Sequence, residues 1–198
     1  MTIDTILALT GFAIATTFTP GPNNVMLMAS GANFGLRRTL PHMAGIAIGV
    51  ASLVFLSGLG LGKVIATAPA IKTAMSAAAV AFLLYLAWKI ATAAPTTKAG
   101  QRTARPLTFL QAAGFQWINP KAWAMAVSVA TVYIPHPDAA TTAVAALIFF
   151  LVAIPSTSLW TAAGERLARW LSTPGRLRLV NLVMAGLLVL TLVPIVLG

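Results

Sequence analysis

The residues best able to do chemistry in this chain lie beside prolines, inside long apolar stretches. Asn119, Pro120 and Lys121 interrupt one stretch, and the run Pro-Gly-Pro-Asn-Asn at 20–24 interrupts another. Asparagine followed by proline is typical of a helix N-cap with proline at the first helical position. Asn23 or Asn24 is expected to cap a helix in the same way after Pro22. Free N–H groups and a positive dipole end at such helix starts favour a carboxylate.

Lys121 is the clearest candidate for a functional charge. A cation inside a spanning segment costs about 2.5–3.5 kcal/mol on insertion scales. Snorkelling to the membrane surface is the alternative, and a position near the middle of the segment disfavours it. The lysine therefore indicates either a functional site or an internal structural pair.

The other candidate substrate-binding residues are amides and one aromatic. Asn23, Asn24 and Asn119 could cap broken helices, contact a ligand, or do both. Gln116 and Trp117 precede the second break and either line a cavity or serve ordinary helix packing. The residues expected to break the helices are Pro20, Gly21, Pro22 and Pro120. Pro155 with Ser156, Thr157 and Ser158 marks a polar kink, which we interpret as local structure.

Acidic residues are scarce, and their absence from the middle of the apolar stretches restricts the chemistry. Asp4, Asp138 and Glu165 all fall near the ends of segments. A site for a dibasic substrate would favour an intramembrane carboxylate, so the sequence favours a neutral one. The ammonium group of such a substrate would be left to backbone carbonyls around Gly21, and no proton-carrying carboxylate is evident.

The sequence contains no motif that indicates a catalytic or metal site. The chain has no cysteine, which excludes thiolate metal sites. His42 and His136 are predicted in loops on opposite sides of the membrane. No nucleophile elbow, paired carboxylates or His–Glu motif occurs, so we expect no enzyme activity, no metal and no cofactor.

The segments that position these residues are those of an all-α integral membrane protein. Hydrophobic residues make up 59% of the 198 residues and charged residues 8%, against about 25% charged in soluble domains. The net charge of +10 is spread in short clusters between apolar runs, which argues against a nucleic-acid partner. A spanning helix needs about 20 apolar residues. Six segments meet this need, at 3–34, 43–62, 71–93, 107–133, 139–164 and 179–198.

Orientation follows from the basic residues. The links after the first, third and fifth segments hold ten of them: Arg37, Arg38, Lys89, Lys98, Arg102, Arg105, Arg166, Arg169, Arg176 and Arg178. The opposite side holds Lys63 and Lys72. Basic residues favour the cytoplasm, so both termini are predicted to face the periplasm across the inner membrane.

The two interrupted segments are each the first of a group of three. Because three is odd, the second group enters the membrane in the opposite direction. The sequence therefore predicts one domain, 1–198, built of two inverted three-helix repeats at about 1–93 and 107–198. Paired broken helices are typical of secondary transporters, whose sites lie where the breaks meet. Gly45 and Gly49 have the spacing of a helix-packing pair.

Three motifs resemble those of the lysine/homoserine/threonine exporter family (LysE/RhtB type). Thr19-Pro20-Gly21-Pro22-Asn23-Asn24 resembles the first signature, Asn119-Pro120-Lys121-Ala122 the second, and residues 83–89 the end of the third helix. The resemblance covers essentially the whole chain. It implies efflux of amino acids or their derivatives, driven by the proton gradient. The sequence Trp-Ala-Met-Ala at 123–126 departs from relatives richer in Leu and Phe, which leaves substrate size open.

Two alternatives stay open. A metal-cation exporter of related architecture would need oxygen, nitrogen or sulfur ligands in its spans. An accessory membrane protein without transport activity would leave Lys121 and the paired breaks unexplained. We therefore favour a secondary-active exporter of neutral amino acids. Substrate identity, the coupling ion and a homo-oligomeric state are left open.

Overall fold

A computed structural model describes residues 1–92, 105–134, 136, 138–170 and 174–197, and every regular element in these ranges is helical. The elements, with η marking a π-helical stretch, are α1 (Ile3–Phe18), α2 (Pro22–Leu56), η1 (Ser57–Leu61), α3 (Gly62–Ala66), α4 (Pro69–Ala91), α5 (Phe109–Ile118), α6 (Pro120–Ser128), η3 (Val129–Tyr133), α7 (Ala139–Trp170), α8 (Pro174–Leu190) and α9 (Val193–Leu197). Lys98 and Arg102, which entered the charge argument, lie outside the described ranges.

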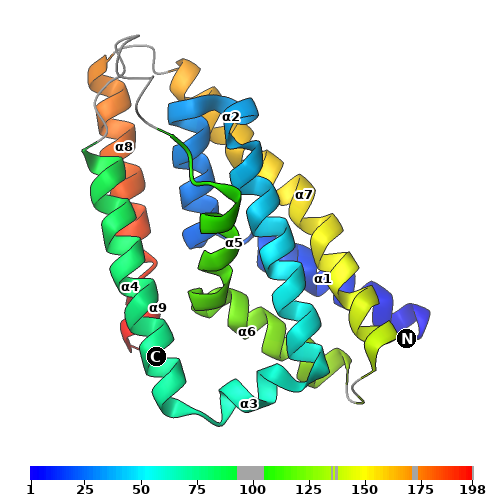
Figure 1. The fold of residues 1–198 in the computed structure, drawn as a ribbon. Helices are drawn as coiled ribbons and strands as arrows, with labels where there is room; N and C mark the ends of the chain where they lie inside the picture. The colour runs from blue at the N-terminus through cyan, green and yellow to red at the C-terminus, as the bar shows by residue number, and fades with distance from the viewer. Residues whose placement is uncertain (93–104, 135, 137, 171–173, 198) are drawn as a thin grey trace.

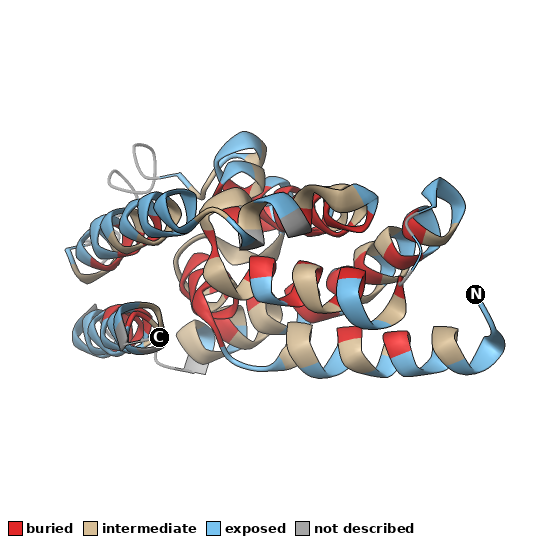
Figure 2. Cartoon of the chain, turned by 90° about the horizontal axis from the view of Figure 1, so that it is seen from below, coloured by how far each residue is buried: buried red, intermediate tan, exposed pale blue. Residues whose placement is uncertain are grey.

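Several of these helices suit a membrane. Pro22–Leu61, Pro69–Ala91 and Ala139–Arg169 are long and apolar enough to cross one, and Ile3–Phe18 and Arg178–Leu190 are shorter apolar helices. Seen along the bundle, the buried residues gather where helices face one another (Figure 2). Outer faces carry large apolar side chains such as Leu84, Trp88 and Leu151, which fits contact with lipid. The chain is thus a multi-pass membrane protein.

Both predicted helix breaks are present. The first apolar segment divides into α1 and the start of α2 around residues 19–21, and the fourth divides into α5 and α6 at Asn119. Both junctions lie between the two ends of the bundle (Figure 1). Proline explains each break because it removes a backbone donor and clashes with the preceding turn.

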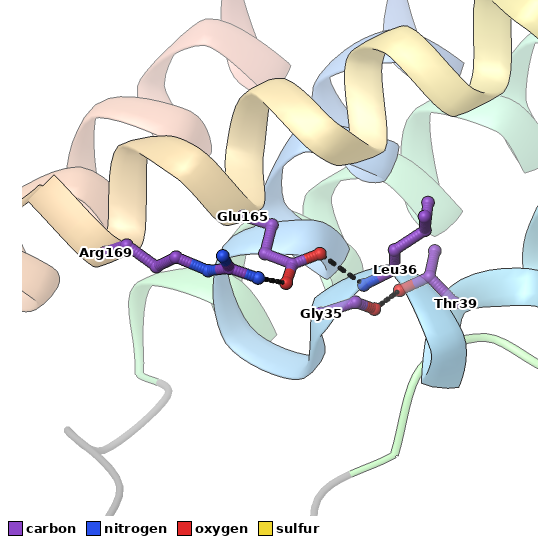
Figure 3. Close-up of polar contacts among 5 residues, drawn as sticks. All are labelled: Gly35, Leu36, Thr39, Glu165 and Arg169. Carbon is purple, nitrogen blue, oxygen red and sulfur yellow. Dashed lines mark hydrogen bonds and ion pairs between the residues drawn. The ribbon is translucent and has the colours of Figure 1, made fainter.

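The link between the first and second segments is shorter than predicted. The label α2 covers two helices that meet at Gly35 (φ 76°, ψ 171°), where the chain reverses direction, and residues 36–42, expected in a loop, are helical. Glycine tolerates this left-handed φ because it lacks a Cβ. Leu36 starts the next turn at once, and its N–H donates to Glu165 Oε2 at 2.9 Å. Arg169 pairs with the same carboxylate, and Thr39 Oγ1 donates to the Gly35 carbonyl (Figure 3).

The location predicted for His42 is also wrong. The sequence predicts it in a loop, but the structure buries it inside α2 with 1% of its surface exposed. The described residues contain no group of three side chains able to hold a metal ion.

α2 is the element that holds the site together. Its glycines let other backbones approach closely: a Cβ at Gly45 would lie 2.4 Å from the Phe109 carbonyl oxygen, and one at Gly49 would lie 2.7 Å from Gln116 Cγ. The predicted packing role of Gly45 and Gly49 is therefore confirmed. α2 packs against both α5 and α7, while α4 packs against α8. The start of α2 is thereby fixed beside the α5–α6 junction.

Candidate functional site

The first break is built by glycine and proline. α1 ends at Phe18, Gly21 is the N-cap of α2 with an extended backbone, and Pro22 is the first helical residue. No side chain caps this helix start. The prediction that Asn23 or Asn24 caps it is therefore wrong, because both residues already lie inside the first helical turn.

The side chain of Asn24 instead closes the end of α1. Its Nδ2 donates to the Thr17 carbonyl at 3.0 Å and to the Thr19 carbonyl at 2.8 Å. Ser156 Oγ, from α7, donates to the same Thr17 carbonyl at 3.0 Å. The last carbonyls of a helix lack intrahelical partners, and inside a membrane they must be satisfied by protein or a wet cavity. Two polar side chains from other elements meet that need here.

The second break is built by Asn119, as the sequence predicts. It ends α5 and caps α6, where its Oδ1 accepts from the Lys121 N–H at 3.1 Å. Pro120 takes the first helical position. The Asn119 side chain is 1% exposed. A new helix therefore starts in the interior of the molecule with its N-terminus oriented by one buried amide.

An amide pair joins the two breaks. Asn23 Nδ2 donates to Gln116 Oε1 at 2.8 Å, and Gln116 Nε2 donates back to Asn23 Oδ1 at 3.1 Å. Gln116 Nε2 also donates to the Ala112 carbonyl at 3.0 Å. Because Gln116 is fully buried, the pair holds the first turn of α2 against the last turn of α5.

Lys121 makes the second connection between the breaks. Its Nζ donates to the Thr19 carbonyl at 2.7 Å and lies 3.4 Å from the Pro20 carbonyl. Both carbonyls belong to the non-helical residues that follow α1. A Cβ at Gly21 would come within 3.0 Å of Lys121 Cδ and Nζ, so glycine leaves room for the lysine. Lys121 thus forms an internal pair, and it occupies the carbonyls that the sequence assigns to a substrate ammonium.

One cavity lies between these elements. Counting its open mouth, it holds about 430 Å³ of empty space. Its lining comes from both breaks and from the neighbouring helices: Thr16, Thr17, Gly21, Pro22, Asn23, Asn24, Ile46, Val50, Asn119, Lys121, Met125, Ala153, Ser156 and Thr157. Lys121 is the only charged member of this lining. The arrangement offers a cation, helix starts and carbonyls to one small polar molecule.

The sequence candidates divide into two sets. Asn23, Asn24, Asn119 and Lys121 all line the cavity, whereas Gln116 and Trp117 do not. Gln116 lies behind Asn23 and positions it. The Trp117 ring packs edge-on against Trp123 with ring centroids 6.1 Å apart, and its carbonyl accepts from Trp123 Nε1 at 2.7 Å. Helix packing is thus the role the contacts give to Trp117.

Four polar lining residues were not predicted to belong to the site: Thr16, Thr17, Ser156 and Thr157. Two hydroxyl residues just before the first break were the available signal for Thr16 and Thr17. The polar kink at Pro155 was noticed but assigned to local structure. The bond from Ser156 to the Thr17 carbonyl corrects that assignment, although Thr157 does bond locally, to the Ala153 carbonyl at 2.8 Å.

Comparison with known proteins identifies a family and several relatives. Residues 14–197 match the family model of the LysE type translocators. The chain is 29% identical over 192 residues to proteins named cysteine/O-acetylserine efflux protein from Escherichia coli (strain K12) and Shigella sonnei (strain Ss046), and each alignment covers 96% of both chains. No solved structure matches the chain.

Proposed function

Because this chain belongs to the LysE type translocator family, we propose that it is a secondary-active exporter of neutral amino acids or their neutral derivatives. The chain is a transporter rather than an enzyme. Its relatives are named for efflux of cysteine and O-acetylserine, which carry one ammonium and one carboxylate each. That chemistry supports the proposed substrate class.

The observation that carries the proposal is the meeting of two helix breaks around one cavity whose only charge is Lys121. A substrate carboxylate finds a cation there, together with the N-terminal ends of α2 and α6. A substrate ammonium finds the carbonyls of Thr19 and Pro20. A dibasic substrate would bring a second cation to a lining that contains no carboxylate, so a neutral zwitterion fits better.

The proposed architecture is one domain, 1–198, of six spans in two inverted repeats. The broken spans would be α1 with the start of α2, and α5 with α6. Contacts between the equivalent spans of the two repeats support this pairing. Asn23 bonds to Gln116 between the two broken spans, and Leu36 bonds to Glu165 between the second and fifth spans. α4, the third span, packs against α8, the sixth. Equivalent elements of a repeat often meet near its pseudo-symmetry axis, where transporter sites lie.

The proposed location is the bacterial inner membrane, with both termini in the periplasm and the proton gradient as the driving force. The charge distribution along the sequence supports the orientation. The cavity lining contains no carboxylate that could carry a proton, so the coupling residue is not assigned.

Counterflow into proteoliposomes tests the proposal. Vesicles loaded with unlabelled L-cysteine should accumulate radiolabelled L-cysteine, and external O-acetylserine, threonine or homoserine should reduce the uptake. Lysine and arginine should compete weakly, because the lining has no carboxylate for a second ammonium. Net efflux should respond to an imposed pH gradient and collapse with a protonophore.

Lys121→Met provides the site variant, and Lys72→Met is its matched control because Lys72 lies exposed near the start of α4. The first should lose counterflow and the second should keep it. Faster exchange of lysine than of any neutral amino acid would contradict the substrate class, and no exchange of any amino acid would contradict the function.

A further inference from the structure

We propose that Lys121 occupies the ammonium subsite of the empty transporter and that a substrate zwitterion enters by an exchange of partners. The substrate ammonium takes the Thr19 and Pro20 carbonyl oxygens, and Lys121 turns to the substrate carboxylate. This inference rests on the proposed function and specifies how its site recognises the substrate.

The contact made by Lys121 identifies the subsite. Its Nζ is a primary ammonium, the same group that an amino acid carries, and it lies 2.7 Å from the Thr19 carbonyl oxygen and 3.4 Å from that of Pro20. Both carbonyls lie in the non-helical residues between α1 and α2, and the acceptors that Lys121 Nζ contacts there are carbonyl oxygens alone. This position therefore accepts a cation without a carboxylate. The lysine therefore stands where the α-ammonium of a substrate would gain the same bonds.

Several other acceptors near the cavity are already engaged. Asn23 Oδ1 accepts from Gln116 Nε2, and Asn119 Oδ1 accepts from the Lys121 N–H. The Thr17 carbonyl accepts from both Asn24 and Ser156. An incoming ammonium would have to break one of these bonds between fixed elements, or displace a single flexible side chain. Displacing Lys121 is the smaller change, because its backbone stays anchored by Asn119.

Charge balance makes the exchange selective for molecules with both groups. An amine that took the carbonyls would leave Lys121 as an unpaired cation inside the protein, which is costly. A carboxylate that drew Lys121 away would leave the Thr19 and Pro20 carbonyls without their cation. A zwitterion supplies a partner for each side, so the net charge of the cavity stays what it was when empty. The exchange also replaces the direct contact between α6 and the end of α1.

Three small molecules separate these cases: L-cysteine, cysteamine, which lacks the carboxylate, and 3-mercaptopropionate, which lacks the ammonium. Equilibrium binding of each, radiolabelled, is measured on the purified full-length protein. The unmodified protein should bind L-cysteine and bind the two half-molecules much more weakly. Lys121→Met removes the lysine from both carbonyls and leaves Asn24 Nδ2 as the remaining donor to that of Thr19. The affinity of this variant for cysteamine should rise about tenfold or more, since one charge-assisted hydrogen bond is worth about that factor. Its affinity for L-cysteine should fall.

A second variant covers the case in which Lys121→Met does not fold. Gly21→Ala places a Cβ within 3.0 Å of Lys121 Cδ and Nζ, and the extended backbone of Gly21 accepts alanine. The Cβ should shift the lysine by a few tenths of an ångström and weaken its bonds to the carbonyls. Cysteamine affinity should then rise in the same direction, by less than in Lys121→Met. Lys72→Met should match the unmodified protein for all three compounds.

The outcomes separate the two proposals. A gain of cysteamine binding in either site variant, absent from Lys72→Met, supports the exchange. If the unmodified protein binds and transports L-cysteine but the folded variants gain no cysteamine binding, the exchange is overturned and the transporter function stands. If cysteamine binds the unmodified protein as well as it binds Lys121→Met, the exchange is also overturned. Failure of the unmodified protein to bind or exchange L-cysteine overturns the proposed substrate and the exchange together.

Discussion

Asn119 lies between two helices: it is the C-cap residue of α5 and the N-cap residue of α6. Replacing it with alanine removes the acceptor for the Lys121 N–H, and loss of such a cap costs about 1 kcal/mol. We expect Asn119→Ala to lower the free energy of unfolding by about that amount and to reduce counterflow, because the start of α6 and Lys121 lose their orientation. Thermal unfolding in detergent and counterflow in vesicles measure the two effects.

Asn119→Ser is the matched control, since serine is also a good N-cap. It should recover most of the stability and part of the transport. Equal loss in both variants would show that the amide is needed for another reason, such as its contact with Gln116 at 3.5 Å.

His42 is a buried polar residue without a hydrogen-bond partner for either ring nitrogen among the described residues. Burying an unpaired polar group costs about 1–3 kcal/mol, so His42→Leu should leave stability unchanged or raise it. Asn181→Leu is the contrasting variant: Asn181 is equally buried but pairs with Asn33 at 2.9 Å, and its loss should destabilise. The midpoint of thermal unfolding compares them.

Transport by His42→Leu should equal that of the unmodified protein, because His42 does not line the cavity. Lost transport with retained stability would assign His42 a role that the static contacts do not reveal.

At the residue scale, some residues of the candidate site could be predicted from the sequence and others could not. Asn119, Pro120 and Lys121 could be recognised because an N-cap is a local pattern and a cation in an apolar stretch is conspicuous. Ser156 could not, because its partner Thr17 lies 139 residues away. The prediction that Asn23 or Asn24 caps a helix failed because both residues fall within the first turn after Pro22, where their side chains bond to Gln116 and to carbonyls at and after the last turn of α1.

At the element scale, the crossing of α2 and α7 depends on two glycines. A Cβ at Gly31 would lie 2.0 Å from the Thr161 carbonyl oxygen, and one at Gly164 would lie 2.0 Å from the Met28 carbonyl oxygen. Overpacking of this kind costs about 1–3 kcal/mol. Gly164→Ala should therefore lower the free energy of unfolding by about 2 kcal/mol and reduce transport, because α2 carries the first break.

Gly114→Ala is the control for that variant, because a Cβ there meets nothing within 4 Å. Alanine is preferred to glycine inside a helix by about 0.5–1 kcal/mol, so this change should be neutral or stabilising. Chemical denaturation of both variants in the same detergent provides the comparison. Similar stability of the two variants would argue against a tight α2–α7 crossing.

Some helices and helix breaks could be predicted from the sequence, whereas one reversal could not. Hydropathy found the apolar stretches, and turn chemistry found the breaks at Pro22 and Pro120. The loop expected between the first two segments is instead a reversal at Gly35. Arg37 and Arg38 were expected in a loop there, yet Glu165 from α7 accepts from the Leu36 N–H and lets a helix restart at once. A cap supplied by a distant helix leaves no local signal.

At the scale of the whole molecule, the basic residues gather toward one end. The reversal of α2, the end of α4, the start of α5, the end of α7 and the start of α8 lie at the upper end in Figure 1, and the start of α1 and α9 lie toward the lower end. The described basic residues that lie in or beside these parts of the chain are Arg37, Arg38, Lys89, Arg105, Arg166, Arg169, Arg176 and Arg178. Basic residues near span ends are retained in the cytoplasm, so this asymmetry predicts the orientation of the entire bundle.

We therefore expect both termini in the periplasm and the link between α4 and α5 in the cytoplasm. Alkaline phosphatase fused after the C-terminus should be active, whereas phosphatase fused after Thr92 should be inactive, because it folds only outside the cytoplasm. Green fluorescent protein at the same two positions should give the opposite pattern. Replacing Arg37 and Arg38 with glutamine should weaken the preference without reversing it, since the other basic residues of that end remain. An inverted pattern at both positions would overturn the orientation and keep the six spans. Two cytoplasmic positions would require an even number of spans after Thr92, and both the six-span count and the inverted repeats would then be wrong.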